Sequence, residues 1–315
     1  MPLLEADPRI ERVVGVARRP FDPAAHGWTK MVYRRGDVRD RGALESALAG
    51  ADVVVHLAFL ITGAASPDTI RGINVDGTLN AVRAAAAAGA ARFVYASSVA
   101  AYGFHADNPV GMTEDWPTRP AERLFYAQEK AELEALLVAE AREHPHLGLY
   151  RLRPPIVLGP HAVGSKSNLA ERLLPVGRRA AQIARRVPLA FPVLVPDLPL
   201  QVIHEDDVGS AFLQCIVGAG PPGAYNIAAD GLLTGADVVR ELGMRPVTIG
   251  SGLLGAMARR VAALPTPAFL PQAVSWAEAL SHPVIIDAGK ARRELHWEPR
   301  FSALDCLRAT LFDAG

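Results

Sequence analysis

The stretch Asp52-Val53-Val54-Val55-His56-Leu57 decides the fold. It is a short, nearly continuous apolar run rich in β-branched residues, which is typical of a strand buried on both faces. A helical pattern follows at residues 67–88, and a second apolar run of the same kind covers Arg92 to Ala96. A strand, a helix and another strand in that order predict a βαβ unit with parallel strands.

The same alternation continues on both sides of this unit. Further strands are predicted at residues 13–17, 147–152 and 201–204, and further helices at residues 41–49, 122–142 and 205–217. The sequence therefore predicts an α/β fold with a doubly wound parallel sheet, which binds ligands at the carboxyl ends of its strands. Because prolines interrupt the pattern after Arg153, we expect residues 156–315 to add elements to the sheet and to form a small C-terminal substrate lobe, irregular at residues 187–199.

The amino-acid composition argues against a nucleic-acid-binding, membrane or disulfide-stabilised protein. The chain has 315 residues, with 33 basic and 33 acidic side chains, so its net charge gives no reason to expect nucleic acid or an anionic membrane as a partner. Two cysteines, Cys215 and Cys306, are too few for a disulfide framework, and no metal site is expected. No signal peptide or membrane-spanning run is visible. We therefore expect a cytoplasmic protein with a small-molecule substrate.

The pair Tyr126 and Lys130 is the clearest chemical signal in the chain. Residues four apart share one face of a helix, and an ammonium beside a phenol favours the phenolate. Such a tyrosine can exchange a proton with a carbonyl or hydroxyl oxygen while a hydride moves to or from nicotinamide. Upstream, Ser97 and Ser98 follow an apolar strand, where a hydroxyl can hold the substrate oxygen. We predict Ser98, Tyr126 and Lys130 as the catalytic residues.

With these residues in place, the chain resembles the NAD-dependent epimerase/dehydratase branch of the extended short-chain dehydrogenases/reductases. The segments that match this family in order are Gly36–Asp40, Asp52–Ala58, Ile73–Thr78, Ser97–Gly103, Arg153–Pro160, His204–Val208 and Asp287–Pro299. The resemblance implies a Rossmann-like NAD(P)-binding region over residues 1–155. It also implies that the cofactor contacts Asp37, Val38, Leu57, Ala58, Asn74, Ser97, Tyr126, Lys130 and Pro155.

A dinucleotide-binding fold normally opens with a strand and a glycine-rich turn that leads into a helix. Neither is found here, because the strand at residues 13–17 already corresponds to the second of the fold. We expect roughly 25 to 30 residues upstream to supply them. The alternative is a natural variant without the phosphate-binding turn. Since arginine at the end of the second strand accommodates the 2′-phosphate of NADP, Arg18 and Arg19 favour NADP, with NAD as the alternative.

Two departures from the family pattern bear on the reaction. The active-site strand continues as Val99 and Ala100, without the acid and base of the family's dehydratases, and Ile156 stands where nucleotide-sugar enzymes of the family carry an asparagine. We therefore favour a carbonyl reductase or alcohol dehydrogenase acting on an apolar substrate. A nucleotide-sugar epimerase with tightly bound NAD is the alternative, supported by the arginines Arg172, Arg178, Arg179, Arg185 and Arg186. A non-catalytic cofactor-binding protein is the third hypothesis.

Family resemblance further suggests a homodimer in which the helices containing residues 79–88 and 126–137 form a four-helix contact. The alanine run from Ala84 to Ala88 permits close approach of two helices.

Overall fold

The computed structural model describes residues 1–61, 66–162, 192–249 and 282–312. Its centre is a parallel sheet in the order β3-β4-β5-β9, built from β3 (Val53–His56), β4 (Arg92–Ala96), β5 (Gly148–Arg153) and β9 (Gly223–Asn226). The α/β fold with parallel strands is thus confirmed. The predicted strand boundaries at residues 52–57 and 147–152 are correct to within one residue at each end.

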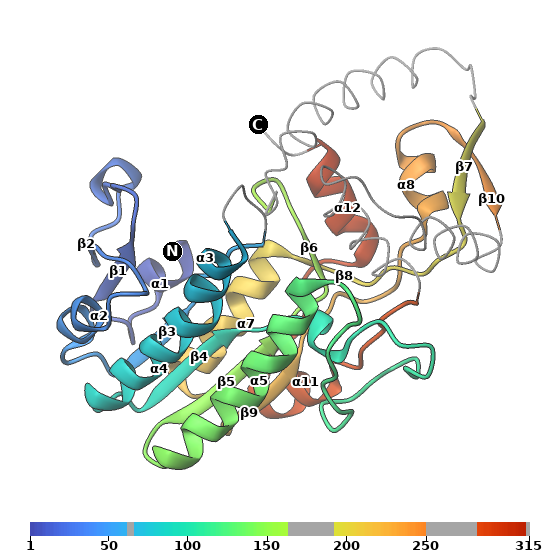
Figure 1. Cartoon of the computed structure of the whole chain (residues 1–315). Helices are drawn as coiled ribbons and strands as arrows, with labels where there is room; N and C mark the ends of the chain where they lie inside the picture. Colours follow the sequence, from blue (N-terminus) through green and yellow to red (C-terminus); the bar gives the residue numbers. More distant parts are fainter. Residues whose placement is uncertain (62–65, 163–191, 250–281, 313–315) are drawn as a thin grey trace.

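Helices cover both faces of this sheet (Figure 1). On one face lie α2 (Arg41–Leu48), α4 (Gly77–Ala87) and α5 (Phe125–Glu143), and on the other lie α7 (Glu205–Val217) and α11 (Gly289–Leu295). Neighbouring residues of β4 point to opposite sides, so that Phe93 joins the core under α4 and α5 while Val94 joins the core under α7 and α11. Burial on both faces explains why this strand is apolar at every central position.

A second, two-stranded parallel sheet pairs β1 (Val13–Ala17) with β2 (Met31–Arg35). Among the described residues, β1 hydrogen-bonds only to β2, and β3 only to β4. The short helix α1 (Pro2–Ala6) packs on α7, and its Glu5 carboxylate accepts hydrogen bonds from the backbone of Thr29 and Lys30 at the start of β2. The N-terminal segment is therefore held against both parts of the fold.

The helix predicted at residues 67–88 is interrupted. It consists of α3 (Pro67–Arg71), a π-helical turn from Gly72 to Asp76, and α4. Single π-helical turns within α-helices are frequent at functional sites. This one presents the buried side chain of Asn74. The helix predicted at residues 122–142 begins at Phe125, three residues later than expected.

The second half of the chain adds two further strand pairs. β6 (Ile156–Leu158) pairs with β8 (Val202–His204), and β7 (Pro192–Pro196) pairs with β10 (Arg245–Ile249) beside α8 (Gly235–Glu241). The prediction of irregular structure at residues 187–199 is therefore wrong for β7. Its prolines stand at the two ends of the strand, where they are tolerated, and the apolar residues between them pair in register.

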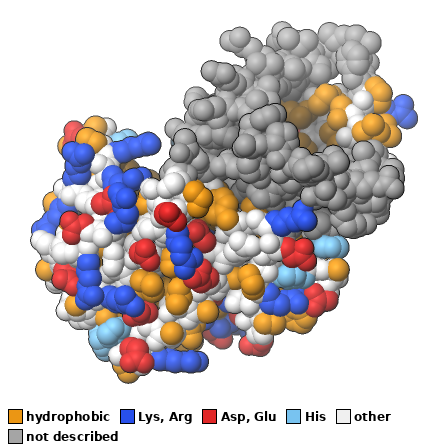
Figure 2. Space-filling view, viewed as in Figure 1, with side chains coloured by type: hydrophobic (Ala, Val, Ile, Leu, Met, Phe, Trp, Pro, Cys, Tyr) orange, Lys and Arg blue, Asp and Glu red, His pale blue; other side chains and the backbone are white. Residues whose placement is uncertain are grey.

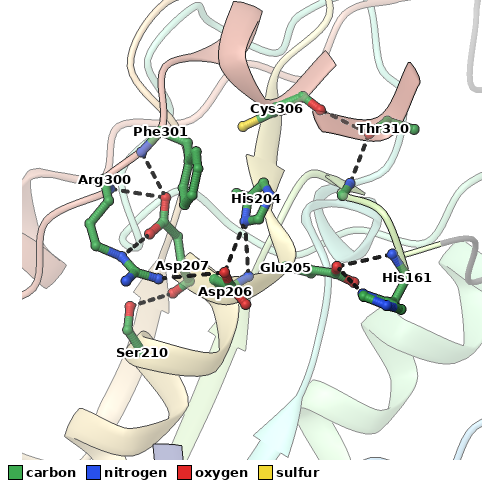
Figure 3. A network of polar contacts seen from close by, with 11 residues as sticks. His161, His204, Glu205, Asp206, Asp207, Ser210, Arg300, Phe301, Cys306 and Thr310 are labelled. Carbon is green, nitrogen blue, oxygen red and sulfur yellow. Dashed lines mark hydrogen bonds and ion pairs between the residues drawn. The ribbon is translucent and has the colours of Figure 1, made fainter. Parts of the chain in front are cut away.

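The start of α7 is tied to the C-terminal segment by the network in Figure 3. The buried carboxylate of Asp207 accepts hydrogen bonds from the backbone N–H groups of Arg300 and Phe301, at 3.0 and 3.2 Å. The ring of His204 stacks on Phe301, with 3.8 Å between ring centroids. These contacts position α12 (Ala303–Phe312). None of the described helices is long and apolar enough to cross a membrane.

Candidate active site

The predicted site residues follow the carboxyl ends of four parallel strands. Arg18 follows β1, Asp37 follows β2, Leu57 follows β3 and Ser97 follows β4. The two sheets are held together at this edge by α2 and α4, which pack on each other, and by Asn80 of α4, whose side chain donates to the Val38 carbonyl at 3.2 Å. The fold thus arranges these groups along one edge.

The structure brings Ser98, Tyr126 and Lys130 together. Ser98 lies close enough to the Tyr126 hydroxyl to favour its ionised form. The Ser98 hydroxyl accepts from the backbone N–H of Ala100 at 3.1 Å, which caps the 3-10 turn Val99–Tyr102. Lys130 lies one turn after Tyr126 on α5, and its Nζ is 5.8 Å from the centroid of the Tyr126 ring. A serine, a tyrosine and a lysine so placed can hold an oxygen atom and move a proton to or from it.

The pKa values of Tyr126 and Lys130 differ from those expected from the sequence. Burial raises the pKa of Tyr126, and the hydrogen bond from Ser98 only partly opposes this. Burial also lowers the pKa of Lys130 to about 7, although Glu134 and Glu129 favour its charged form. The expected lowering of the Tyr126 pKa by the ammonium is therefore not found, because loss of hydration is the larger effect for both groups.

The Ser97 side chain is bound to α5 through Glu134. Its hydroxyl donates to the buried carboxylate of Glu134 at 2.7 Å, which also receives Arg151 at 2.7 Å and both Nε and Nη2 of Arg153 at 2.8 Å. Arg153 in turn donates to the Tyr102 hydroxyl. The segment from Ser97 to Tyr102, which we call the serine segment, is therefore held at both ends. The Ser97 side chain is thus engaged inside the protein, and we predict a structural role for it.

Asn74 is also fully engaged. Its amide makes a pair of hydrogen bonds with the backbone of Leu60, accepting from the N–H at 2.6 Å and donating to the carbonyl at 3.0 Å. The same amide nitrogen donates to Glu129 at 2.7 Å. Asn74 therefore fixes the loop after β3 against α5, and its side chain does not extend to Lys130.

Basic side chains gather over the end of the molecule formed by β1 and β2 (Figure 2). Arg18 and Arg19 are exposed there, and Arg35 donates to the Arg18 carbonyl at 3.0 Å. The carboxylate of Asp37 is ion-paired with Arg39, which together with Arg18 lowers its pKa to about 2. An anionic acceptor beside exposed guanidinium groups suits the adenosine end of a dinucleotide.

The remaining predicted residues line the same edge. Leu57 is 64% exposed and Ala58 is exposed, which leaves the end of β3 open to a ligand. Pro155 is buried, and the carbonyl of Pro154 accepts from the N–H of Val99, which places the loop before β6 beside the serine segment. Ile156 is 52% exposed. The arginines between Arg172 and Arg186 lie outside the described residues.

Three important residues were not predicted from the sequence: Phe59, Glu129 and Glu134. Glu134 is four residues after Lys130 on the same face of α5, a spacing that could have identified it. Phe59 lies in a loop and gives no periodic signal, so its contact with Lys130 is visible only in three dimensions.

Comparison with protein families adds the decisive observation. The model of the NAD dependent epimerase/dehydratase family matches residues 2–228. The chain belongs to this family. Its members are NAD-dependent enzymes, and the matched range includes all the predicted catalytic residues.

Individual relatives agree with this assignment. The uncharacterized protein y4nG of Sinorhizobium fredii is 29% identical over 300 residues, covering 91% of this chain and 70% of its own. The N-acetyl-alpha-D-glucosaminyl-diphospho-ditrans,octacis-undecaprenol 4-epimerase of Escherichia coli O157:H7 is 34% identical over 140 residues, covering 44% of this chain and 41% of its own. The structure of UDP-glucuronic acid 4-epimerase from Bacillus cereus in complex with NAD has a TM-score of 0.66 at 17% identity, covering 96% of this chain and 90% of its own. At that identity the likeness concerns the fold.

Proposed function

We propose that this family member is an epimerase that acts on a sugar carried by a diphosphate, inverting a carbinol carbon through oxidation and re-reduction. The observation that carries this proposal is the position of Ser98 beside the Tyr126 hydroxyl, with Lys130 one helical turn away. The sequence similarity to a diphosphosugar 4-epimerase spans 140 residues and favours a sugar substrate over the simple ketone expected from sequence.

The protein's own groups would act on one substrate oxygen. Ser98 would hold this oxygen by a hydrogen bond, and Tyr126 would take its proton during oxidation and return it during reduction. Because burial raises the pKa of Tyr126, its phenol must first release its own proton to solvent before it can accept the substrate proton, and the charged form of Lys130 would favour that phenolate. Bound NAD(P), held at the adenosine end by Asp37 and the neighbouring arginines, would supply the site that accepts and returns the hydride.

The test is incubation of the purified protein with NAD, and separately with NADP, and a panel of UDP-linked and polyprenyl-diphosphate-linked hexoses. An epimer that accumulates to a constant ratio from either side, with no net consumption of the cofactor, supports the proposal. Stoichiometric reduction of the cofactor with formation of a keto sugar, or no change in any sugar of the panel with either cofactor, contradicts it.

A carbonyl reductase acting on an apolar ketone is the second candidate. Ile156 favours it, since its half-exposed side chain lies beside the serine segment and can neither donate nor accept a hydrogen bond. Net oxidation of NADPH by apolar ketones, with no epimerisation of diphosphosugars, would establish this candidate in place of the first.

We also propose that NADP is preferred over NAD. The exposed guanidinium groups of Arg18 and Arg19 can pair with a 2′-phosphate, whereas a 2′-hydroxyl gives them no anion. We expect NADPH to bind at least about tenfold more tightly than NADH in a fluorescence titration, a difference worth about 1.4 kcal/mol. The variant Arg18→Gln should lose this preference and retain NADH affinity, with Arg41→Gln as a control on α2. Equal affinities in the unmodified protein would contradict the proposal.

The proposed assembly is a homodimer through α4 and α5. The alanine run of α4, on which the sequence prediction rested, is not available for this contact, because Ala84, Ala85 and Ala86 are buried within the protomer. Ala135 and Ala139 are exposed one turn apart on α5, and small side chains let helices approach closely. A monomeric mass by light scattering would exclude it.

A further inference from the structure

The ammonium group of Lys130 lies among aromatic rings. Its Nζ is 3.9 Å from the centroid of the Phe59 ring and 4.7 Å from that of Tyr95. It also donates hydrogen bonds to the Tyr95 hydroxyl at 3.1 Å and to the Ala96 carbonyl at 2.6 Å. The residue as a whole is only 3% exposed, so that these groups replace most of the water around the ammonium.

Phe59 is held in this place by its neighbour. The backbone of Leu60 makes two hydrogen bonds with the amide of Asn74, which the π-helical turn directs toward the loop. The Phe59 ring also meets the Tyr126 ring edge to face, with 5.5 Å between centroids. One phenyl ring therefore contacts both residues of the predicted catalytic pair.

A cation over the face of an aromatic ring is attracted by the ring quadrupole, most strongly where water is excluded. The other ionisable groups that influence Lys130 are Glu129 and Glu134 on its own helix, His56 at the end of β3, and the hydroxyls of Tyr95 and Tyr126. The carboxylates favour the ammonium, while burial opposes it and brings the pKa to about 7. At that value a modest attraction changes the fraction that is charged at neutral pH.

We propose that Phe59 is a positioning residue of the active site, whose ring face holds Lys130 in its charged form beside Tyr126. The inference rests on the proposed function only for the statement that Lys130 serves catalysis. The contact itself and its effect on Lys130 can be measured without substrate or cofactor.

The experiment uses a series of ring fluorinations at position 59. Fluorine withdraws electron density from the ring face and leaves the shape of the ring almost unchanged, so a merely structural role of Phe59 would not respond to it. The full chain would carry mono-, di- or trifluorinated phenylalanine at this position, together with lysine labelled with carbon-13 at the ε position. The chain has four lysines, Lys30, Lys130, Lys166 and Lys290, so the NMR titration has few signals. Lys130→Arg identifies the relevant one.

We expect the pKa of Lys130 to fall stepwise with the number of fluorines, by roughly one unit for the trifluorinated ring. Phe59→Tyr should leave it close to the unmodified value. The same series at Phe104, which like Tyr126 packs against the adjacent cluster of buried residues around Leu124, should have no effect. A Lys130 pKa that does not change across the Phe59 series, or one that changes equally in the Phe104 series, would overturn the proposal. Failure of the epimerase assay would leave these titrations fully interpretable.

Discussion

Replacing Glu134 by alanine is expected to lower the free energy of unfolding by about 3–5 kcal/mol. The carboxylate is 1% exposed and accepts four hydrogen bonds, from Ser97, Arg151 and twice from Arg153. Its loss leaves Arg153, whose side chain is 4% exposed, as a buried cation without an anion. Urea unfolding at pH 7 measures the difference.

A matched control lies on the same helix. Glu132 forms a two-point ion pair with Arg71, but these side chains are 38% and 53% exposed. Since exposed pairs contribute little, Glu132→Ala should cost less than about 1 kcal/mol. The double variant Glu134→Leu with Arg153→Met removes both buried charges and should recover part of the loss. Equal costs for Glu134→Ala and Glu132→Ala would show that burial of the pair has no energetic consequence.

The loss of stability caused by Glu134→Ala is expected to become smaller as the pH falls. Burial alone would raise the pKa of Glu134, but the hydrogen bonds and charges of the two arginines, with the Ser97 hydroxyl, outweigh it and lower the pKa below 4.5. A carboxylate with a lowered pKa in the folded state contributes stability above its unfolded pKa and loses it as the pH falls through the folded value. The difference between the unmodified protein and Glu134→Ala should therefore be complete at pH 7 and diminish in acid.

The parts of the fold predicted from sequence are the strands made up mostly of apolar residues. In β3, β4 and β5 this composition follows from helices that cover both faces of the sheet, and it can be recognised from neighbours in sequence alone. β1 was predicted from its apolar residues as well, although none of them is fully buried. β2 was not predicted, because three of its five residues are polar or charged and it packs less deeply. β7 was missed for a different reason, since its prolines indicated a break although they stand only at its ends.

The active site likewise has features that the sequence predicts and features that it does not. Tyr126 and Lys130 were identified because a helical spacing of four links them directly. The pKa values of Tyr126 and Lys130 could not be predicted in the same way. They follow from burial by β4, the loop after β3 and the segment from Ser97 to Tyr102, all of which lie more than 20 residues away in sequence. The roles of Ser97 and Asn74 depend likewise on Glu134 and Glu129, their hydrogen-bond partners on α5.

Replacing Tyr126 by phenylalanine is expected to reduce turnover by roughly 100-fold to 10,000-fold, because the variant loses the group that carries the proton while keeping its ring. The Ser98 hydroxyl remains bonded to the N–H of Ala100, and the ring remains packed against Phe59, so stability should change little. The measurement is the rate of epimerisation of whichever diphosphosugar the unmodified protein converts, with thermal unfolding recorded in parallel.

The control for this variant is Tyr150→Phe, which removes a hydroxyl that donates to the Gly220 carbonyl at 2.8 Å, outside the serine segment and the Tyr126–Lys130 pair. It should retain turnover within a few fold, while stability falls by about 1 kcal/mol for the lost hydrogen bond. Reduced stability without loss of turnover in Tyr150→Phe, and the reverse in Tyr126→Phe, would separate a chemical role from a structural one. Undiminished turnover in Tyr126→Phe would instead mean that the proton passes through another group, such as the neighbouring Ser98 hydroxyl.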